Sequence, residues 1–313
     1  MNPAFSVIFL TTLSGAGQGL LLALYGAEVA ARLDVIDAPA HRDFYALGSL
    51  VAVGLAGLGL VASFFHLGRP GRAWRSVAMW RTSWLSREVI ALPAFMAATA
   101  LYGLAHYLGG RGTIAIGLAA TVLCIALFVC TGMIYACIRF LQEWSSPLTV
   151  VNFFVLGTAS GLTLAAAFSA RTAPALARDF AMIALLTTFA GLCTRSMSLV
   201  RNARLRRRST IQTAIGIRHP QIRQKSQGAM GGSFNTREFF HGKSLAFVRH
   251  VKWAFLLTAF AIPLVLLYVA GARASAPGLS SAFAIQLLGL MAERWYFFAE
   301  AKHPQNLYYQ AIS

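Results

Sequence analysis

Long apolar runs separated by short polar turns make up most of the chain. A helix needs about 20 mostly apolar residues to cross a bilayer, where its backbone polar groups must pair within the segment. Eight runs meet this requirement, so we predict an all-α, polytopic bundle of eight transmembrane helices that forms one membrane domain over residues 1–313. The predicted spans are 5–31, 44–67, 85–109, 112–138, 149–170, 175–200, 246–271 and 277–300.

Composition agrees with a membrane protein, because 57% of the 313 residues are hydrophobic and only 12% are charged. The first apolar run lacks a cationic leader and is too long for a signal-peptide core, so we expect it to remain as the first span. Within it, Gly15 and Gly19 have the spacing that favours close helix packing. The cysteines lie in apolar runs without a C-x-x-C pair, which predicts neither a zinc site nor a disulfide framework.

Basic residues are distributed unevenly between the two predicted sides of the membrane. An even number of spans puts both termini on one side, and that side receives 21 of the 27 Lys and Arg residues. The positive-inside rule makes it the cytoplasmic side, which predicts a multi-pass membrane protein with both termini in the cytoplasm. Since the net charge of +17 comes from loops between spans, it does not indicate nucleic-acid binding.

The segment at about 201–245 is the one sizeable polar region of the sequence and lies on the predicted cytoplasmic side. It mixes arginine with glycine, serine, asparagine and aromatic residues. Such a loop either orders itself on a protein partner or is attracted to anionic lipid. Its length and aromatic content favour the protein partner over membrane lipid.

Ionisable residues near the membrane gather at this same side. His66 is predicted at the end of the second span and Glu88 at the start of the third, so an antiparallel hairpin returns Glu88 to the depth of His66. Quinone reduction and quinol oxidation move two electrons with two protons, and require a hydrogen-bond partner and a proton donor or acceptor. A histidine and a partly desolvated carboxyl group are suited to these roles. Glu88 beside Arg87 also fits a surface ion pair.

No electron carrier is evident in the chain itself. It has no cysteine cluster for iron and sulfur, and His106 is predicted at the opposite membrane face from His66, which does not fit a bis-histidine haem. We therefore expect neither haem nor metal here, and electrons that arrive through another subunit.

The motif "HLGRPGRAWR" followed by "SWLSRE" resembles the signature of membrane anchor subunits in the dimethyl sulfoxide reductase family. The stretches "STIQTAIGIRHPQIRQKSQGAMGGSFNTREFFHG" and "AERWYFFAEAKHPQNLYYQ" are similar to the branch that serves cytoplasmic sulfite:quinone oxidoreductases. The resemblance implies eight helices, a molybdopterin catalytic subunit and an iron–sulfur subunit that contacts the cytoplasmic face. It also implies that His66 and Glu88 bind ubiquinone or menaquinone. The other predicted quinone-site residues are Arg69, Arg72, Trp84, Arg87, Arg294 and Trp295.

Three alternative functions remain open for this sequence. They are the anchor of a dimethyl sulfoxide reductase-type enzyme that oxidises quinol, a proton-coupled transporter, and a purely structural anchor. Against the transporter, the ionisable groups gather at one face rather than at the midplane. The exported dimethyl sulfoxide reductase has its catalytic subunits on the non-cytoplasmic face of the membrane. This argues against the first alternative, because the predicted quinone-site residues lie on the predicted cytoplasmic side.

Overall fold

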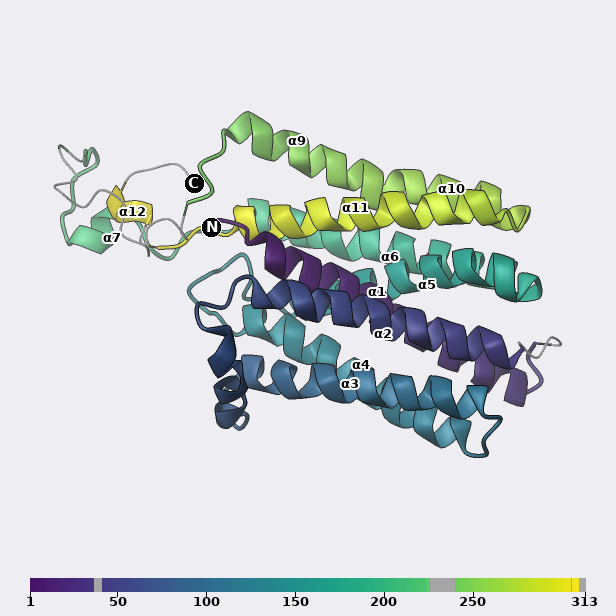
Figure 1. Cartoon of the computed structure of the whole chain (residues 1–313). Coiled ribbons are helices and arrows are strands. Elements are labelled where there is room, and N and C mark those ends of the chain that lie inside the picture. The colour runs from purple at the N-terminus through teal and green to yellow at the C-terminus, as the bar shows by residue number, and fades with distance from the viewer. Residues whose placement is uncertain (37–40, 224, 226–239, 305, 310–313) are drawn as a thin grey trace.

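The computed structural model describes residues 1–36, 41–223, 225, 240–304 and 306–309, and within them all regular elements are helical. The long helices lie side by side in an elongated bundle (Figure 1). They are α1 (Phe5–Arg32), α2 (Arg42–Phe64), α3 (Trp84–Tyr107), α4 (Thr113–Ala136), α5 (Pro147–Thr172), α6 (Ala177–Ala203), α9 (Leu245–Leu256), α10 (Ile262–Ala272) and α11 (Ala276–Glu300). Shorter segments are η1 (Pro70–Met79), η2 (Pro174–Leu176), η3 (Leu257–Ala261), α7 (Ile211–Ile215) and α12 (Asn306–Tyr309).

Seven helical segments of the described chain are long and apolar enough to cross a membrane. The seventh, Leu245–Ala272, consists of α9, the π-helical turn η3 and α10. Helix α11 occupies the eighth predicted span and is 25 residues long, but it is not among the seven. It carries Glu293, Arg294 and Glu300 near its end, which lowers its apolar character. The all-helical prediction is confirmed, and the eighth crossing stays a prediction.

The first residue and the end of α11 lie at the same end of the bundle. The Met1 amino group donates a hydrogen bond of 2.7 Å to the carbonyl of Ala301, directly after α11. The end of α2 and the start of α3 lie there too, and η1 crosses between them (Figure 1). The chain therefore brings residues 66 to 88 to the end of the bundle that holds Met1.

Serine caps begin several helices where the apolar runs start. The Ser83 hydroxyl accepts a hydrogen bond from the Ser86 amide at the start of α3. The Ser146 hydroxyl accepts one from the Leu148 amide at the start of α5, where Pro147 occupies the first turn. Both satisfy amides that a helix leaves unpaired at its N-terminus. These caps fix where α3 and α5 start, at the end of the bundle that holds Met1.

Helix α1 packs against α2, α4, α5 and α11, and its contact with α5 is a backbone contact between glycines. A Cβ atom built on Gly161 would lie 2.2 Å from the carbonyl carbon of Gly19, and one on Gly19 would lie 2.5 Å from the Gly157 carbonyl oxygen. Gly15 also faces Gly157. The close packing predicted from Gly15 and Gly19 is confirmed, because no side chain fits between the two helices.

We expect Gly161→Ala to destabilise the bundle markedly, since the new methyl group must push α1 and α5 apart. Overpacking of this kind costs about 1–3 kcal/mol. Gly54→Ala in α2 is the matched control, because its Cβ meets nothing within 4 Å and alanine favours a helix. Thermal unfolding in detergent measures both variants. Equal melting temperatures for the two would contradict the glycine contact.

Candidate functional site

His66 lies just beyond α2, which ends at Phe64, rather than in its last turn as the sequence predicts. The residue is solvent-accessible, yet the neighbouring chain removes part of its hydration, and this lowers the imidazole pKa below its ordinary value. The imidazole is therefore mostly neutral at pH 7, with one N–H donor and one acceptor nitrogen. Within the described part of the chain it has no hydrogen-bond partner, so both nitrogens are available to a ligand. Phe65 and Trp74, both strongly exposed, are close to it in sequence and supply apolar surface.

Glu88 lies at the start of the second turn of α3 and is buried, with 9% of its surface exposed. Its carboxylate accepts a hydrogen bond of 2.5 Å from the Thr131 hydroxyl of α4. Tyr135, one turn further along α4, packs against aromatic rings of α5 and α11, with its ring centroid 5.4 Å from that of Phe153 and 5.5 Å from that of Phe298. The packing of α3 on α4 thus places a carboxyl group and a hydroxyl together near the end of the bundle. Sequence analysis missed Thr131.

The structure places His66 and Glu88 at the same end of the bundle, as predicted, but it does not pair them directly. In the described residues, the one side-chain hydrogen bond of Glu88 is to Thr131. His66 is exposed whereas Glu88 is buried. The two groups therefore differ in access: the imidazole meets water or a ligand first, and the carboxyl group lies deeper, between α3 and α4.

Arg87 and Trp84 fasten the segment after η1 to the start of α3. The Arg87 guanidinium donates hydrogen bonds to the carbonyls of Trp80, at 2.9 Å, and Arg81, at 2.7 Å. It also lies over the Trp84 ring, 4.3 Å from the centroid, in a cation–π contact. In the described residues Arg87 therefore makes no ion pair with Glu88 and instead holds the turn at Trp80 and Arg81 against the start of α3. Arg69 and Arg72, at the start of this segment, are exposed.

Arg294 and Trp295, the two predicted quinone-site residues on α11, lie in different surroundings from each other. Arg294 is buried over the Phe153 ring of α5, at 4.1 Å, and its Nε donates to Glu293 at 2.6 Å. Trp295 packs edge-on against Phe247 of α9. Arg294 and Trp295 thus pack against α5 and α9, and in the described part of the chain neither forms a hydrogen bond or an ion pair with His66 or Glu88.

A buried ion network joins α6 to α11 beside Arg294. Arg195 of α6 lies 2.6 Å from one carboxylate oxygen of Glu293, and 3.7 Å from a carboxylate oxygen of Glu300. Arg195 and Glu293 are almost completely shielded from solvent. The negative charge of Glu293 is thus shared between two buried guanidiniums, and the network ties the end of α11 to the bundle.

A second buried carboxylate lies at the opposite end of the bundle, and sequence analysis missed it. Glu28 of α1 accepts hydrogen bonds from the hydroxyls of Tyr102 (2.8 Å) and Thr113. The Nε2 atom of His106 lies 3.3 Å from the same carboxylate. Tyr45 stacks on the His106 ring at 4.3 Å. The cluster joins α1 to α3 and α4. Like Glu88, Glu28 accepts a hydrogen bond from a threonine of α4, but it lies at the end of the bundle opposite to His66.

These features define an all-helical membrane protein whose accessible histidine and buried carboxyl group lie at one end of the bundle, beside an exposed basic and aromatic segment. The chain belongs to the family described as DMSO reductase anchor subunit (DmsC), whose model matches residues 1–309. It is also similar to the C subunit of sulfite dehydrogenase from Allochromatium vinosum. The two are 52% identical over 326 aligned residues, which cover the full length of both chains. The predicted family is confirmed. Parts of both motifs similar to the sulfite-oxidising branch, residues 224, 226–239, 305 and 310, lie outside the described residues.

Proposed function

We propose that this chain is the quinone-reactive membrane anchor of a molybdopterin and iron–sulfur oxidoreductase that oxidises sulfite. The observation that carries the proposal is the pair of groups on the family signature, an accessible imidazole at His66 and a buried carboxyl group at Glu88, at one end of the bundle. Membership of the anchor family supports the proposed molybdopterin and iron–sulfur partners. The similarity to one subunit of a sulfite dehydrogenase supports sulfite as the proposed substrate.

The residues present fit a quinone headgroup. Quinone sites combine apolar walls with a few polar groups that fix orientation. A neutral His66 can donate a hydrogen bond to a ring oxygen, and Glu88, hydrogen-bonded to Thr131, can hold and pass a proton behind it. Oxidation of sulfite by water to sulfate releases two electrons and two protons at the molybdenum subunit. Reduction of quinone to quinol takes up two electrons from the iron–sulfur subunit and two protons at this site.

The surrounding residues have supporting roles in this proposal. Arg87 and Trp84 hold the loop that carries His66, while the exposed Arg69 and Arg72 orient the headgroup or contact the partner. Arg294, buried over Phe153 and paired with Glu293, stays a predicted site residue. The concentration of basic residues at this end supports a cytoplasmic location for it, with eight crossings of the inner membrane.

His66→Asn tests the site in the purified complex. We expect quinone-linked turnover to fall by about tenfold or more, since acid–base groups typically contribute 10²–10⁴-fold and asparagine retains part of the hydrogen bonding. Electron transfer from sulfite to an artificial dye should stay at the level of the native complex. His41→Asn is the matched control, because His41 is also an exposed histidine but lies before α2, at the far end of the bundle. Unchanged quinone kinetics in His66→Asn would overturn the assignment of His66.

Co-purification in mild detergent tests the class of protein. A molybdenum and iron–sulfur pair bound to the native chain is expected. Solute flux in vesicles that contain this chain alone would instead support a transporter.

A further inference from the structure

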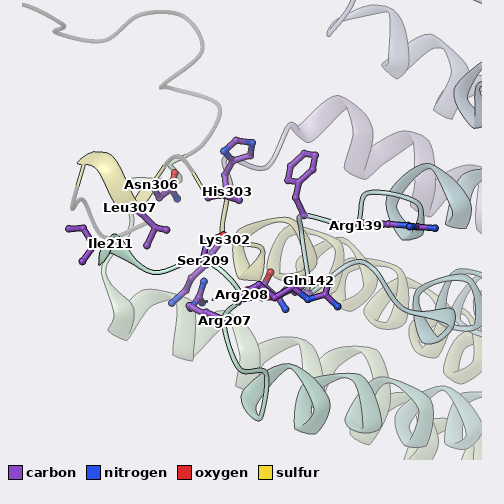
Figure 2. Close-up of a pocket in the computed structure, with 13 residues that line it drawn as sticks. Arg139, Gln142, Arg207, Arg208, Ser209, Ile211, Lys302, His303, Asn306 and Leu307 are labelled. Carbon is purple, nitrogen blue, oxygen red and sulfur yellow. Dashed lines mark hydrogen bonds and ion pairs between the residues drawn. The ribbon is translucent and has the colours of Figure 1, made fainter. Parts of the chain in front are cut away.

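A cavity of about 630 Å³ lies at the site end of the bundle, outside the helices themselves. Three chain segments form it: residues 139–143 after α4, residues 207–209 and 211 after α6, and residues 302–304, 306 and 307 after α11. Figure 2 shows these segments converging, with Arg207, Arg208 and Lys302 close together. In Figure 1 the neighbouring helices α7 and α12 extend beyond the end of the bundle. The cavity therefore lies beyond the ends of the helices that are apolar enough to cross a membrane.

Internal hydrogen bonds hold two of these segments together. The Gln142 side chain donates to the Arg206 carbonyl at 3.3 Å and accepts from the Arg208 amide at 3.2 Å. The Arg201 guanidinium donates to the carbonyls of Gln142, at 3.0 Å, and Ser145, at 3.1 Å. These bonds hold the loop after α4 against the end of α6 and the segment that follows it.

Positive charge in the cavity is only partly compensated. Among the described residues, Arg139, Arg207, Arg208 and Lys302 line it together with one carboxylate, Glu143, which pairs with Arg207 at 3.6 Å. Partial burial and the nearby Arg207 charge lower the pKa of the Lys302 ammonium. The described cations thus outnumber the carboxylate, and an anion bound there would relieve the repulsion between them.

We propose that this cavity binds acidic side chains of the electron-transfer subunit, and so serves as a docking site for that partner. The inference rests on the proposed function and names the chemistry of one contact in it. Guanidinium groups bind carboxylates in bidentate geometry, and arginine with apolar side chains is typical of protein interfaces. Phe140, Ile211 and Leu307 supply the apolar part of the wall. Because the cavity lies past the ends of α4, α6 and α11, an acidic protein segment reaches it more directly than a lipid phosphate.

Charge reversal in the purified complex tests the proposal. We expect Arg139→Glu/Arg208→Glu to release the iron–sulfur subunit at a lower salt concentration, with an apparent affinity reduced about tenfold or more by like-charge repulsion. Arg249→Glu is the control, since Arg249 is an exposed arginine of α9 outside the cavity. Equal retention of the partner by the double variant and the control would overturn the docking site.

Photo-cross-linking identifies the occupant directly. A photoreactive residue at Phe140, which is 57% exposed in the cavity wall, should capture a peptide of the iron–sulfur subunit rich in Asp and Glu. The same residue at Phe189, which is exposed on α6, should not. Phospholipid adducts alone at Phe140, or peptides of this chain alone, would overturn the proposal.

The failure of this inference differs from a failure of the proposed function. If the molybdenum and iron–sulfur pair co-purifies with the native chain but charge reversal does not loosen it, only the docking site is wrong. If no such pair co-purifies at all, the proposed function is wrong as well. His66→Asn should retain the partner at every salt concentration that the native chain tolerates, because His66 does not line the cavity.

Discussion

Replacing Glu88 with glutamine is expected to lower quinone-linked turnover of the assembled complex by about 100-fold, within the range typical for loss of an acid–base group. Glutamine has nearly the same volume and can still accept the hydrogen bond from Thr131, so the contact between α3 and α4 is retained. It cannot take up or release a proton, and quinone reduction requires two of them. The effect should therefore appear in turnover with quinone and not in the amount of complex.

Glu28→Gln provides a matched control for this experiment. Glu28, like Glu88, is a buried glutamate that accepts a hydrogen bond from a threonine; it also accepts one from Tyr102, and it lies at the other end of the bundle. We expect this variant to lower the melting temperature and to leave quinone kinetics of the assembled complex unchanged. Dye-linked sulfite oxidation should be the same in both variants. A Glu88→Gln complex with native quinone turnover would show that the proton moves by another route.

The helices were predictable because lipid leaves the backbone few alternatives. A span predicted at 5–31 is α1, Phe5–Arg32, and a span predicted at 112–138 is α4, Thr113–Ala136. In both, a continuous apolar run must form its own backbone hydrogen bonds, so length and hydropathy suffice to locate it. The segment Pro70–Met79 was not predicted as a helix, since it is short, polar and rich in arginine. Its 3₁₀ conformation depends on the ends of α2 and α3 that it connects.

The candidate site was predictable only in part. The antiparallel hairpin places His66 and Glu88 at one end, because consecutive spans must reverse direction. It does not determine which neighbouring helix faces Glu88, and Thr131 of α4 takes that position. Apolar periodicity carries no information on such pairs, since a fully buried helix is apolar all round. For the same reason the sequence did not predict the pairing of Arg195 with Glu293, which joins residues of α6 and α11 that are distant in sequence.

Glu293→Gln is expected to destabilise the folded bundle by about 3–5 kcal/mol, the usual cost of breaking a buried ion pair by removing one partner. Arg195 and Arg294 would both remain buried, and among the described residues only Glu300, at 3.7 Å from Arg195, would still oppose their charge. Thermal unfolding in detergent should show a large fall in melting temperature.

Glu143→Gln is the control that separates burial from simple loss of charge. Its partner Arg207 is exposed, so this variant should lose less than about 1 kcal/mol. Because α11 carries three charged residues near its end, the Glu293 network is also what allows this helix to pack among apolar neighbours. Without this network, the end of α11 should detach from the bundle first. Ala299 is buried in the native chain, so a cysteine substituted there (Ala299→Cys) should be labelled by a thiol reagent faster in Glu293→Gln than in Glu143→Gln. Equal labelling rates and equal melting temperatures in the two variants would show that the network does not hold α11 in place.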